Sequence, residues 1–156
     1  MSDWLARAAE HGIVVPGPLP PAARYQAVVV HGTTAFTSGV VALEGPPWQL
    51  LWAGALGAEL SLEEGQASAR GAMLTTLGNL AGALDDPTRI ERFLRLTGYV
   101  RAAPGFDRAP AVLDGASNLL AQLFGDELLP ARTALPVPML PGGASVEIEC
   151  IVAVRA

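Results

Sequence analysis

Residues 131–154, ARTALPVPMLPGGASVEIECIVAV, hold two apolar runs joined by a segment rich in proline and glycine. In the second run, 145–154, the even-numbered residues from 146 onwards are apolar and share one face of a strand. Glu147 and Glu149 then share the opposite face. The earlier run, 132–137, predicts a second strand. These runs are the closing strands of a sheet, and the two glutamates point away from its core.

Two helices and a further strand are predicted before these runs. Residues 61–64, SLEE, form a capping box in which a serine is followed three residues later by a glutamate, so a helix starts at Leu62 and continues to residue 84. Asp85-Asp86-Pro87 ends it. The run 90–100 predicts a strand, and a second helix over 108–124 stops at a glycine.

The N-terminal part of the chain combines a helix, an arm and a hairpin. Residues 3–11 predict a short amphipathic helix. Four prolines within 14–21 exclude regular structure there and predict an extended arm against the surface. The β-branched runs 25–30 and 35–41 predict a β-hairpin. Residues 48–52 form either a short strand or a buried loop.

This order of elements indicates an α+β domain, with two helices packed on one face of a mixed β-sheet. We divide the chain into an N-terminal helix and proline-rich arm, 1–21, and one domain, 22–156. No internal repeat is visible.

The composition narrows the function classes. All ten basic residues are arginine, which excludes Schiff-base and P-loop lysine chemistry. The net charge of −5 disfavours a nucleic-acid partner. Charged residues make up only 16% of the chain, against a usual share of about 25%, and this apolar surplus favours an oligomer.

The compartment is expected to be the cytoplasm. The N-terminus lacks an apolar signal core, and charges interrupt every stretch long enough to span a membrane, so no membrane association is expected. The single cysteine, Cys150, falls on the apolar face of its strand, where burial makes a thiol inert. No residue spacing indicates a metal site, and no cofactor is expected.

Arg132, Glu147 and Glu149 are the polar groups left to carry chemistry. Arg132 either makes a surface ion pair or holds a small carboxylate with its guanidinium fork. The glutamates are either two solvated acids on an open sheet face or include one acid/base group.

Two segments resemble the reactive intermediate deaminases, the Rid/YjgF family that is also called L-PSP. Ala131-Arg132-Thr133-Ala134, followed after a bend by the strand around Glu147, is similar to the family's closing signature. Tyr25, followed by a strand and by Thr37-Ser38-Gly39, is similar to its opening signature. Both internal spacings agree with the family without insertions, and the resemblance covers residues 22–156.

The resemblance implies a chorismate-mutase-like fold, a homotrimer and ligand clefts between subunits. It implies hydrolysis of reactive 2-imino and enamino acids to 2-oxo acids and ammonia, as in 2-iminobutanoate/2-iminopropanoate deaminases. Glu147 and Arg132 would be the catalytic residues: Arg132 would clamp the carboxylate, and Glu147 would position water or move protons. Tyr25, Gly39 and Thr133 would bind the substrate.

Departures from the family pattern keep a second function open. Many deaminating members have a cysteine two residues after the arginine, where this chain has Ala134. The alternative is a non-catalytic trimer of the same family that binds or senses a small carboxylate through Arg132. Ribonuclease activity has been attached to some relatives, and the acidic, lysine-free composition disfavours it here.

Overall fold

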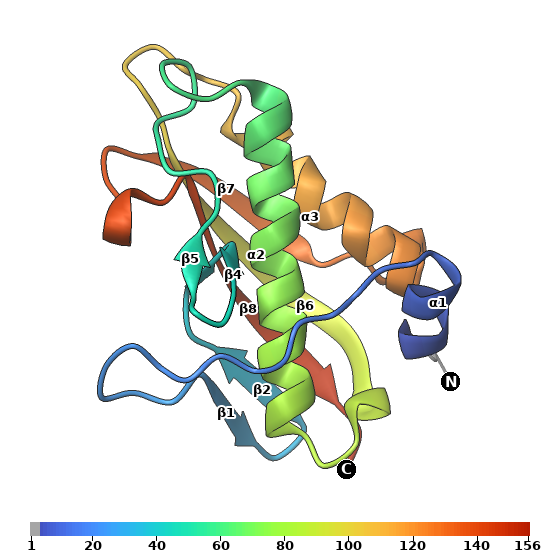
Figure 1. Ribbon diagram of the computed structural model, residues 1–156. Helices are drawn as coiled ribbons and strands as arrows, with labels where there is room; N and C mark the ends of the chain where they lie inside the picture. The colour runs from blue at the N-terminus through green and yellow to red at the C-terminus, as the bar shows by residue number, and fades with distance from the viewer. Residues whose placement is uncertain (1–3) are drawn as a thin grey trace.

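Six strands form one mixed sheet, and two long helices cover one of its faces (Figure 1). The computed structural model describes residues 4–156, so Asp3, the first residue of the helix expected over 3–11, lies outside the described residues. The helices are α1 (Trp4–Glu10), α2 (Leu62–Ala83) and α3 (Ala109–Phe124), with short 3-10 turns η1 (Pro87–Arg89), η2 (Asp126–Leu128) and η3 (Pro141–Gly143). The sheet strands are β1 (Val28–His31), β2 (Thr34–Thr37), β3 (Val40–Val41), β6 (Ile90–Arg101), β7 (Ala131–Val137) and β8 (Val146–Val154), and a separate hairpin holds β4 (Leu43–Glu44) and β5 (Gln49–Leu50).

The strand order is β1-β2-β8-β6-β7, and β3 also pairs with β8. Only β6 and β7 run parallel, because α3 provides the crossover that returns the chain to the same end of the sheet. The other pairs of this sheet are antiparallel. This topology confirms the predicted α+β class and its helix-covered mixed sheet.

The long helices begin and end close to the predicted residues. At the start of α2, the Ser61 hydroxyl accepts a hydrogen bond from the Glu64 backbone N–H, and the Glu64 carboxylate accepts one from the Ser61 N–H, which is the predicted capping box. Helix α3 ends at Phe124, followed by Gly125 at a φ of 97°. Glycine is favoured at such a φ because glycine has no β-carbon.

The core lies between the helices and the sheet. The even-numbered residues of β8, from Val146 to Val154, are all buried, as the period of two predicted. Helix α1 joins this core: Trp4 is fully buried, its ring lies 5.9 Å from that of Phe124, and its indole N–H donates to the Pro87 carbonyl. The N-terminal helix therefore contributes to the core from the lower end of α3 (Figure 1).

The predicted arm crosses the lower part of α2 on its way from α1 to β1 (Figure 1). A β-carbon on Gly78 of α2 would lie 2.3 Å from the Pro16 carbonyl oxygen, so the helix has no side chain where the arm crosses. Leu19 N–H donates to the Asn79 Oδ1 over 2.8 Å. The arm is thus fixed to the helix surface, as expected.

The hairpin bounds differ from the prediction. Strand β1 starts at Val28, so Tyr25 precedes it, and the run 35–41 is divided into β2 and β3 at Ser38-Gly39. The division arises because Ser38 bonds back to the chain before β1: its N–H donates to Ala27 and its hydroxyl to Gln26. Residues 48–52, expected to form a short strand or a buried loop, contain the short strand β5, which pairs with β4.

Among the described residues, no helix has the length and apolar character needed to cross a bilayer.

Candidate functional site

Glu147 lies in a cavity of about 490 Å³ at the point where β2 gives way to β3. The sides come from the arm, from β3 and β4, and from the loop before β8. The lining residues are Leu19, Pro20, Pro21, Ala22, Tyr25, Ala27, Ser38, Gly39, Val40, Val41, Leu43, Asn79, Pro141 and Glu147. Most of them are apolar, and Glu147 is the only carboxylate among them.

The carboxylate of Glu147 is free of protein partners. No hydrogen bond or ion pair joins it to the rest of the described chain, 4–156. Burial raises its pKa, and the negative charge of nearby Glu149 raises it further. Glu149 itself accepts a hydrogen bond from the Tyr99 hydroxyl over 3.1 Å. Glu147 is therefore the acid of this pair that is available to a ligand.

Gly39 lies directly beneath this carboxylate. A β-carbon at position 39 would lie 2.1 Å from the Glu147 Oε1, so only glycine leaves the space that the carboxylate occupies. Tyr25 lines the same cavity, and its hydroxyl accepts from the Ala22 N–H over 3.3 Å. The structure thus brings together three of the residues expected at the site: Tyr25, Gly39 and Glu147.

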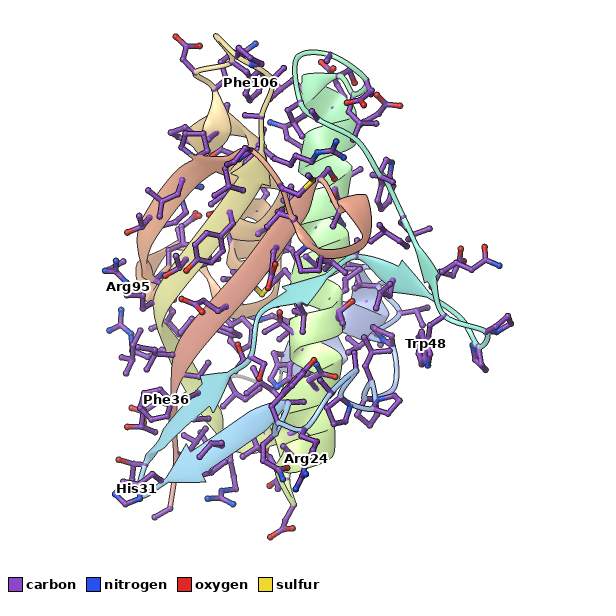
Figure 2. All side chains as sticks on the ribbon, turned by 90° about the vertical axis from the view of Figure 1, so that its left-hand side faces the viewer. Arg24, His31, Phe36, Trp48, Arg95 and Phe106 are labelled. Carbon is purple, nitrogen blue, oxygen red and sulfur yellow. The ribbon has the colours of Figure 1, made fainter. Side chains whose placement is uncertain are left out.

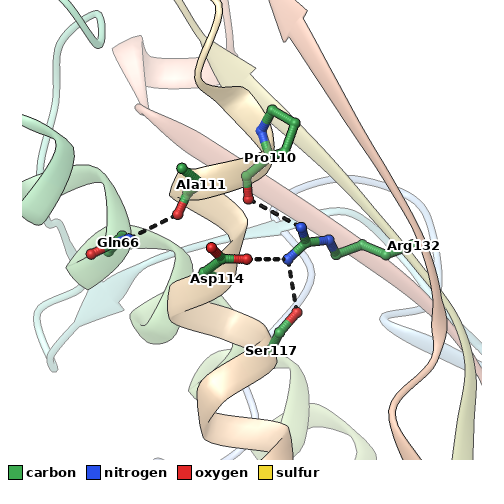
Figure 3. Close-up of polar contacts among 6 residues, drawn as sticks. All are labelled: Gln66, Pro110, Ala111, Asp114, Ser117 and Arg132. Carbon is green, nitrogen blue, oxygen red and sulfur yellow. Dashed lines mark hydrogen bonds and ion pairs between the residues drawn. The ribbon is translucent and has the colours of Figure 1, made fainter.

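Arg132 lies outside this cavity and faces α3 (Figure 3). Its Nη1 donates to the Asp114 carboxylate and to the Ser117 hydroxyl, both over 2.9 Å, and its Nη2 donates to the Pro110 carbonyl over 3.1 Å. The Arg132 and Asp114 side chains remain 25% and 49% exposed. The ion pair that the sequence offered as one alternative for Arg132 therefore forms with Asp114.

Strand pairing explains why Arg132 and Glu147 do not meet within one chain. Arg132 pairs with Leu96, which pairs in turn with the buried Cys150, so Arg132 belongs to the helix-covered face. Glu147 pairs with Tyr99 and belongs to the opposite face. The expected cluster of Arg132 and Glu147 is therefore absent from the single described chain.

Thr133 lies on the helix-free face but also outside the cavity. Its hydroxyl accepts a hydrogen bond from Arg95 Nη2 over 2.7 Å. Figure 2 shows Arg95 and Phe36 on this face of the sheet. Strand β6 lies between Thr133 of β7 and Glu147 of β8, so the two residues do not meet within one chain.

The described part of the chain offers little support for catalysis by a cysteine or serine nucleophile or by a metal ion. Burial raises the pKa of the Cys150 thiol well above its usual range, which makes it inert as predicted. The Ser38 hydroxyl donates to the Gln26 carbonyl, so its proton is directed at the backbone rather than at a base that would activate it as a nucleophile. Within residues 4–156, no cluster of histidine, cysteine and acidic side chains is large enough to hold a metal ion.

The sequence predicted an arm against the surface and left its role at the site open, and the structure makes the arm part of this cavity. Leu19, Pro20, Pro21 and Ala22 form one wall, and Asn79 of α2 holds that wall through Leu19. A signal was present in the sequence, since α2 carries glycines at 78 and 82 that lower its helix propensity. Both make room for the arm, Gly78 for Pro16 and Gly82 for the Pro18 ring.

Comparison with known proteins identifies the family. The model of the family described as "YjgF/chorismate_mutase-like, putative endoribonuclease" matches residues 6–154. The chain belongs to the YjgF/chorismate-mutase-like family. The curated protein TCP17 of Trypanosoma cruzi is 35% identical over 142 residues, which are 90% of this chain and 88% of that protein.

Two solved structures share this YjgF fold over nearly the whole chain. One is a "putative endoribonuclease" from Shewanella oneidensis, with a TM-score of 0.90 and 26% identity, covering 97% of this chain and 99% of the other. The second is an Agrobacterium tumefaciens protein of unknown function, with a TM-score of 0.88 and 29% identity, covering 99% and 94%. These matches confirm the chorismate-mutase-like fold and the family resemblance drawn from the two sequence signatures.

Proposed function

We propose that this protein hydrolyses reactive 2-imino and enamino acids to 2-oxo acids and ammonia in the cytoplasm, with Glu147 as the acid/base group. The observation that carries the proposal is the unpartnered Glu147 carboxylate, held half-buried above Gly39 in a largely apolar cavity. A carboxylate whose pKa is raised towards neutrality is suited to exchanging protons with water and with a nitrogen.

The reaction needs one water and one such group. Water adds to the carbon of the C=N bond while one of its protons passes to the Glu147 carboxylate, which then donates that proton to the nitrogen, giving a carbinolamine. The hydroxyl proton of the carbinolamine next passes through Glu147 to the nitrogen as the C–N bond breaks and the C=O bond forms, so that ammonia leaves. Glu147 ends in its starting state, and no redox partner or covalent enzyme intermediate is required. Positioning and proton transfer account for the acceleration.

A complete site requires residues from two copies of the chain. We assign Tyr25, Gly39 and Glu147 to one half-site, and Arg132 and Thr133 of a neighbouring copy to the other, where Arg132 clamps the substrate carboxylate. The homotrimer implied by the family resemblance would supply such a neighbour. Exposed apolar side chains on the helix-free face support an assembly of this kind: Val29, Phe36 and Leu135.

Imines released by an amino-acid oxidase provide the test. Hydrolysis is followed as the loss of imine that semicarbazide can trap. We expect Glu147→Gln to reduce kcat/KM by about 10²–10⁴-fold, the range that one acid/base group contributes. Glu63→Gln, a charge-matched change at an exposed position of α2, should leave the rate unchanged. Full activity in Glu147→Gln would overturn the proposed role of Glu147.

The second candidate is a trimer that binds or senses a small carboxylate without turnover. Ala134 motivates it, because many deaminating members of the family have a cysteine at this position, two residues after the arginine. Calorimetry with pyruvate distinguishes binding from catalysis. The binding role alone is supported if the wild-type protein binds pyruvate saturably but does not accelerate imine decay, and if Arg132→Ala abolishes the binding. Endoribonuclease, the activity in the family description, is less favoured because the cavity presents a carboxylate and the chain has a net charge of −5.

A further inference from the structure

The Glu147 cavity is far larger than the smallest imino acids require. Its volume of about 490 Å³ falls within the range of about 300–1,000 Å³ typical of sites that hold drug-sized ligands. An imine derived from alanine carries a single methyl group and would leave most of this space to water. The size of the cavity therefore points to a larger substrate.

The chemistry of the walls indicates what the additional space holds. The arm segment 19–22, LPPA, supplies one part of the apolar lining, and Val40, Val41 and Leu43 of the β3–β4 segment supply another. Three polar lining residues besides Glu147 each have one protein partner. The Tyr25 hydroxyl accepts from the Ala22 N–H, the Ser38 hydroxyl donates to the Gln26 carbonyl, and the Asn79 Oδ1 accepts from the Leu19 N–H. Apolar walls of this kind gain free energy by covering apolar groups of the ligand, in proportion to the area removed from water.

The arm wall is held in place by contacts with α2. Asn79 is only 4% exposed and accepts the Leu19 N–H over 2.8 Å. Proline rings fix the backbone on both sides of Leu19, and Pro18 lies against Gly82 of α2. A wall that is already ordered does not have to be ordered on binding, which removes an entropic cost of association.

We propose that the site selects imines with a large apolar substituent, such as those derived from leucine, methionine or phenylalanine, and that the arm segment 19–22 determines this specificity. The inference rests on the proposed hydrolysis for its reaction. The C=N group faces Glu147, and the substituent lies between the arm and the β3–β4 wall. Since one methylene in an apolar pocket changes kcat/KM by about 10–200-fold, the leucine-derived imine should exceed the alanine-derived one by at least about tenfold.

A matched pair of substitutions on the arm tests the proposal. Ala22 and Ala23 are adjacent and both exposed, but only Ala22 lines the cavity. We expect Ala22→Trp to fill the space and lower kcat/KM for the leucine- and phenylalanine-derived imines by about tenfold or more, while the alanine-derived imine changes by less than about twofold. Ala23→Trp should alter none of the three. Equal losses for all three imines in Ala22→Trp, or a wild-type preference for the alanine-derived imine, would overturn the inference.

Binding of the product 2-oxo acids separates the inference from the proposed reaction. Calorimetry compares 4-methyl-2-oxopentanoate, the product from leucine, with pyruvate, the product from alanine. The apolar selectivity would be supported if the wild-type protein binds the larger acid more tightly and Ala22→Trp abolishes this difference in affinity. This holds even if the wild-type protein hydrolyses no imine. The absence of both turnover and size-dependent binding would refute the reaction and the selectivity together.

Discussion

A β-carbon on Gly39 would lie only 2.1 Å from the Glu147 Oε1. The bare backbone at the break between β2 and β3 is therefore the surface on which the carboxylate lies. The φ of Gly39 is not in the left-handed region, so other residues could adopt its backbone conformation. Space for Glu147 is the reason that position 39 requires glycine.

Gly39→Ala should therefore displace the Glu147 carboxylate while keeping the fold. We expect kcat/KM for imine hydrolysis to fall by at least about tenfold, since misplacement of a catalytic group by an ångström can cost about 10²-fold. Imine loss in the coupled oxidase assay measures the rate, and circular dichroism checks the fold. Gly17→Ala is the control, because a β-carbon there meets nothing within 4 Å. An active Gly39→Ala enzyme would show that the carboxylate position is not critical.

The pH profile should report the raised pKa of Glu147. If ionised Glu147 accepts the proton of water, activity falls as the pH drops through that raised pKa, because the protonated carboxyl cannot accept it. Glu149→Gln removes the neighbouring negative charge but keeps an acceptor for Tyr99. It should lower the pKa of Glu147 and move the acid limb of kcat/KM to lower pH.

Burial, the larger cause of the shift, remains in Glu149→Gln, so the acid limb should stay above the range of an ordinary glutamate. Glu63→Gln provides the charge-matched control, and unfolding monitored at each pH excludes acid denaturation. If the acid limb of Glu149→Gln lies at the same pH as that of the wild type, the limb reports the titration of a group other than Glu147.

The alternation in β8 was sufficient to predict which side chains enter the core and that Glu147 leaves it. The capping box at Ser61 likewise fixed the start of α2 from four consecutive residues. Both signals are local, because they depend on residues that are neighbours in the chain.

The place of Arg132 could not be predicted in the same way. Its face depends on the register of β7 against β6, in which Arg132 pairs with Leu96, and that register involves residues far apart in the sequence. The arm wall has the same non-local origin, because Leu19 and Asn79 are sixty positions apart. Motif spacing grouped Arg132 with Glu147 without indicating that the two residues lie on opposite faces of the sheet.

The ion pair between Arg132 and Asp114 should compete with a bound carboxylate. Both side chains are partly exposed, so breaking the pair should cost less than about 1 kcal/mol of folding free energy. If Arg132 clamps the substrate, Asp114→Asn removes the negative charge that competes for its guanidinium, and KM for a 2-imino acid should fall severalfold with little change in kcat. Asp107→Asn, at an exposed position before α3, is the matched control. An unchanged KM in Asp114→Asn would indicate that Arg132 serves only to join β7 to α3.

If the site is shared between copies of the chain, a substitution that dissociates the oligomer should also abolish the activity. Leu135 is 43% exposed on the helix-free face of β7, where a neighbouring sheet would cover it. We expect the wild-type mass in solution, measured by light scattering, to be three times the 16.1 kDa of the chain. Leu135→Glu would place a charge in that contact, so the protein should dissociate and lose imine hydrolysis, because Arg132 and Glu147 no longer meet.

Met139→Glu is the control for this substitution, since Met139 is also apolar and exposed but lies in the loop that follows β7. It should keep both the mass and the rate. The helix-covered core of the monomer is independent of position 135, so Leu135→Glu should still give the circular dichroism spectrum of a folded α+β protein. A wild-type protein that is monomeric and fully active would contradict the shared site, because the two residues lie on opposite faces of one sheet.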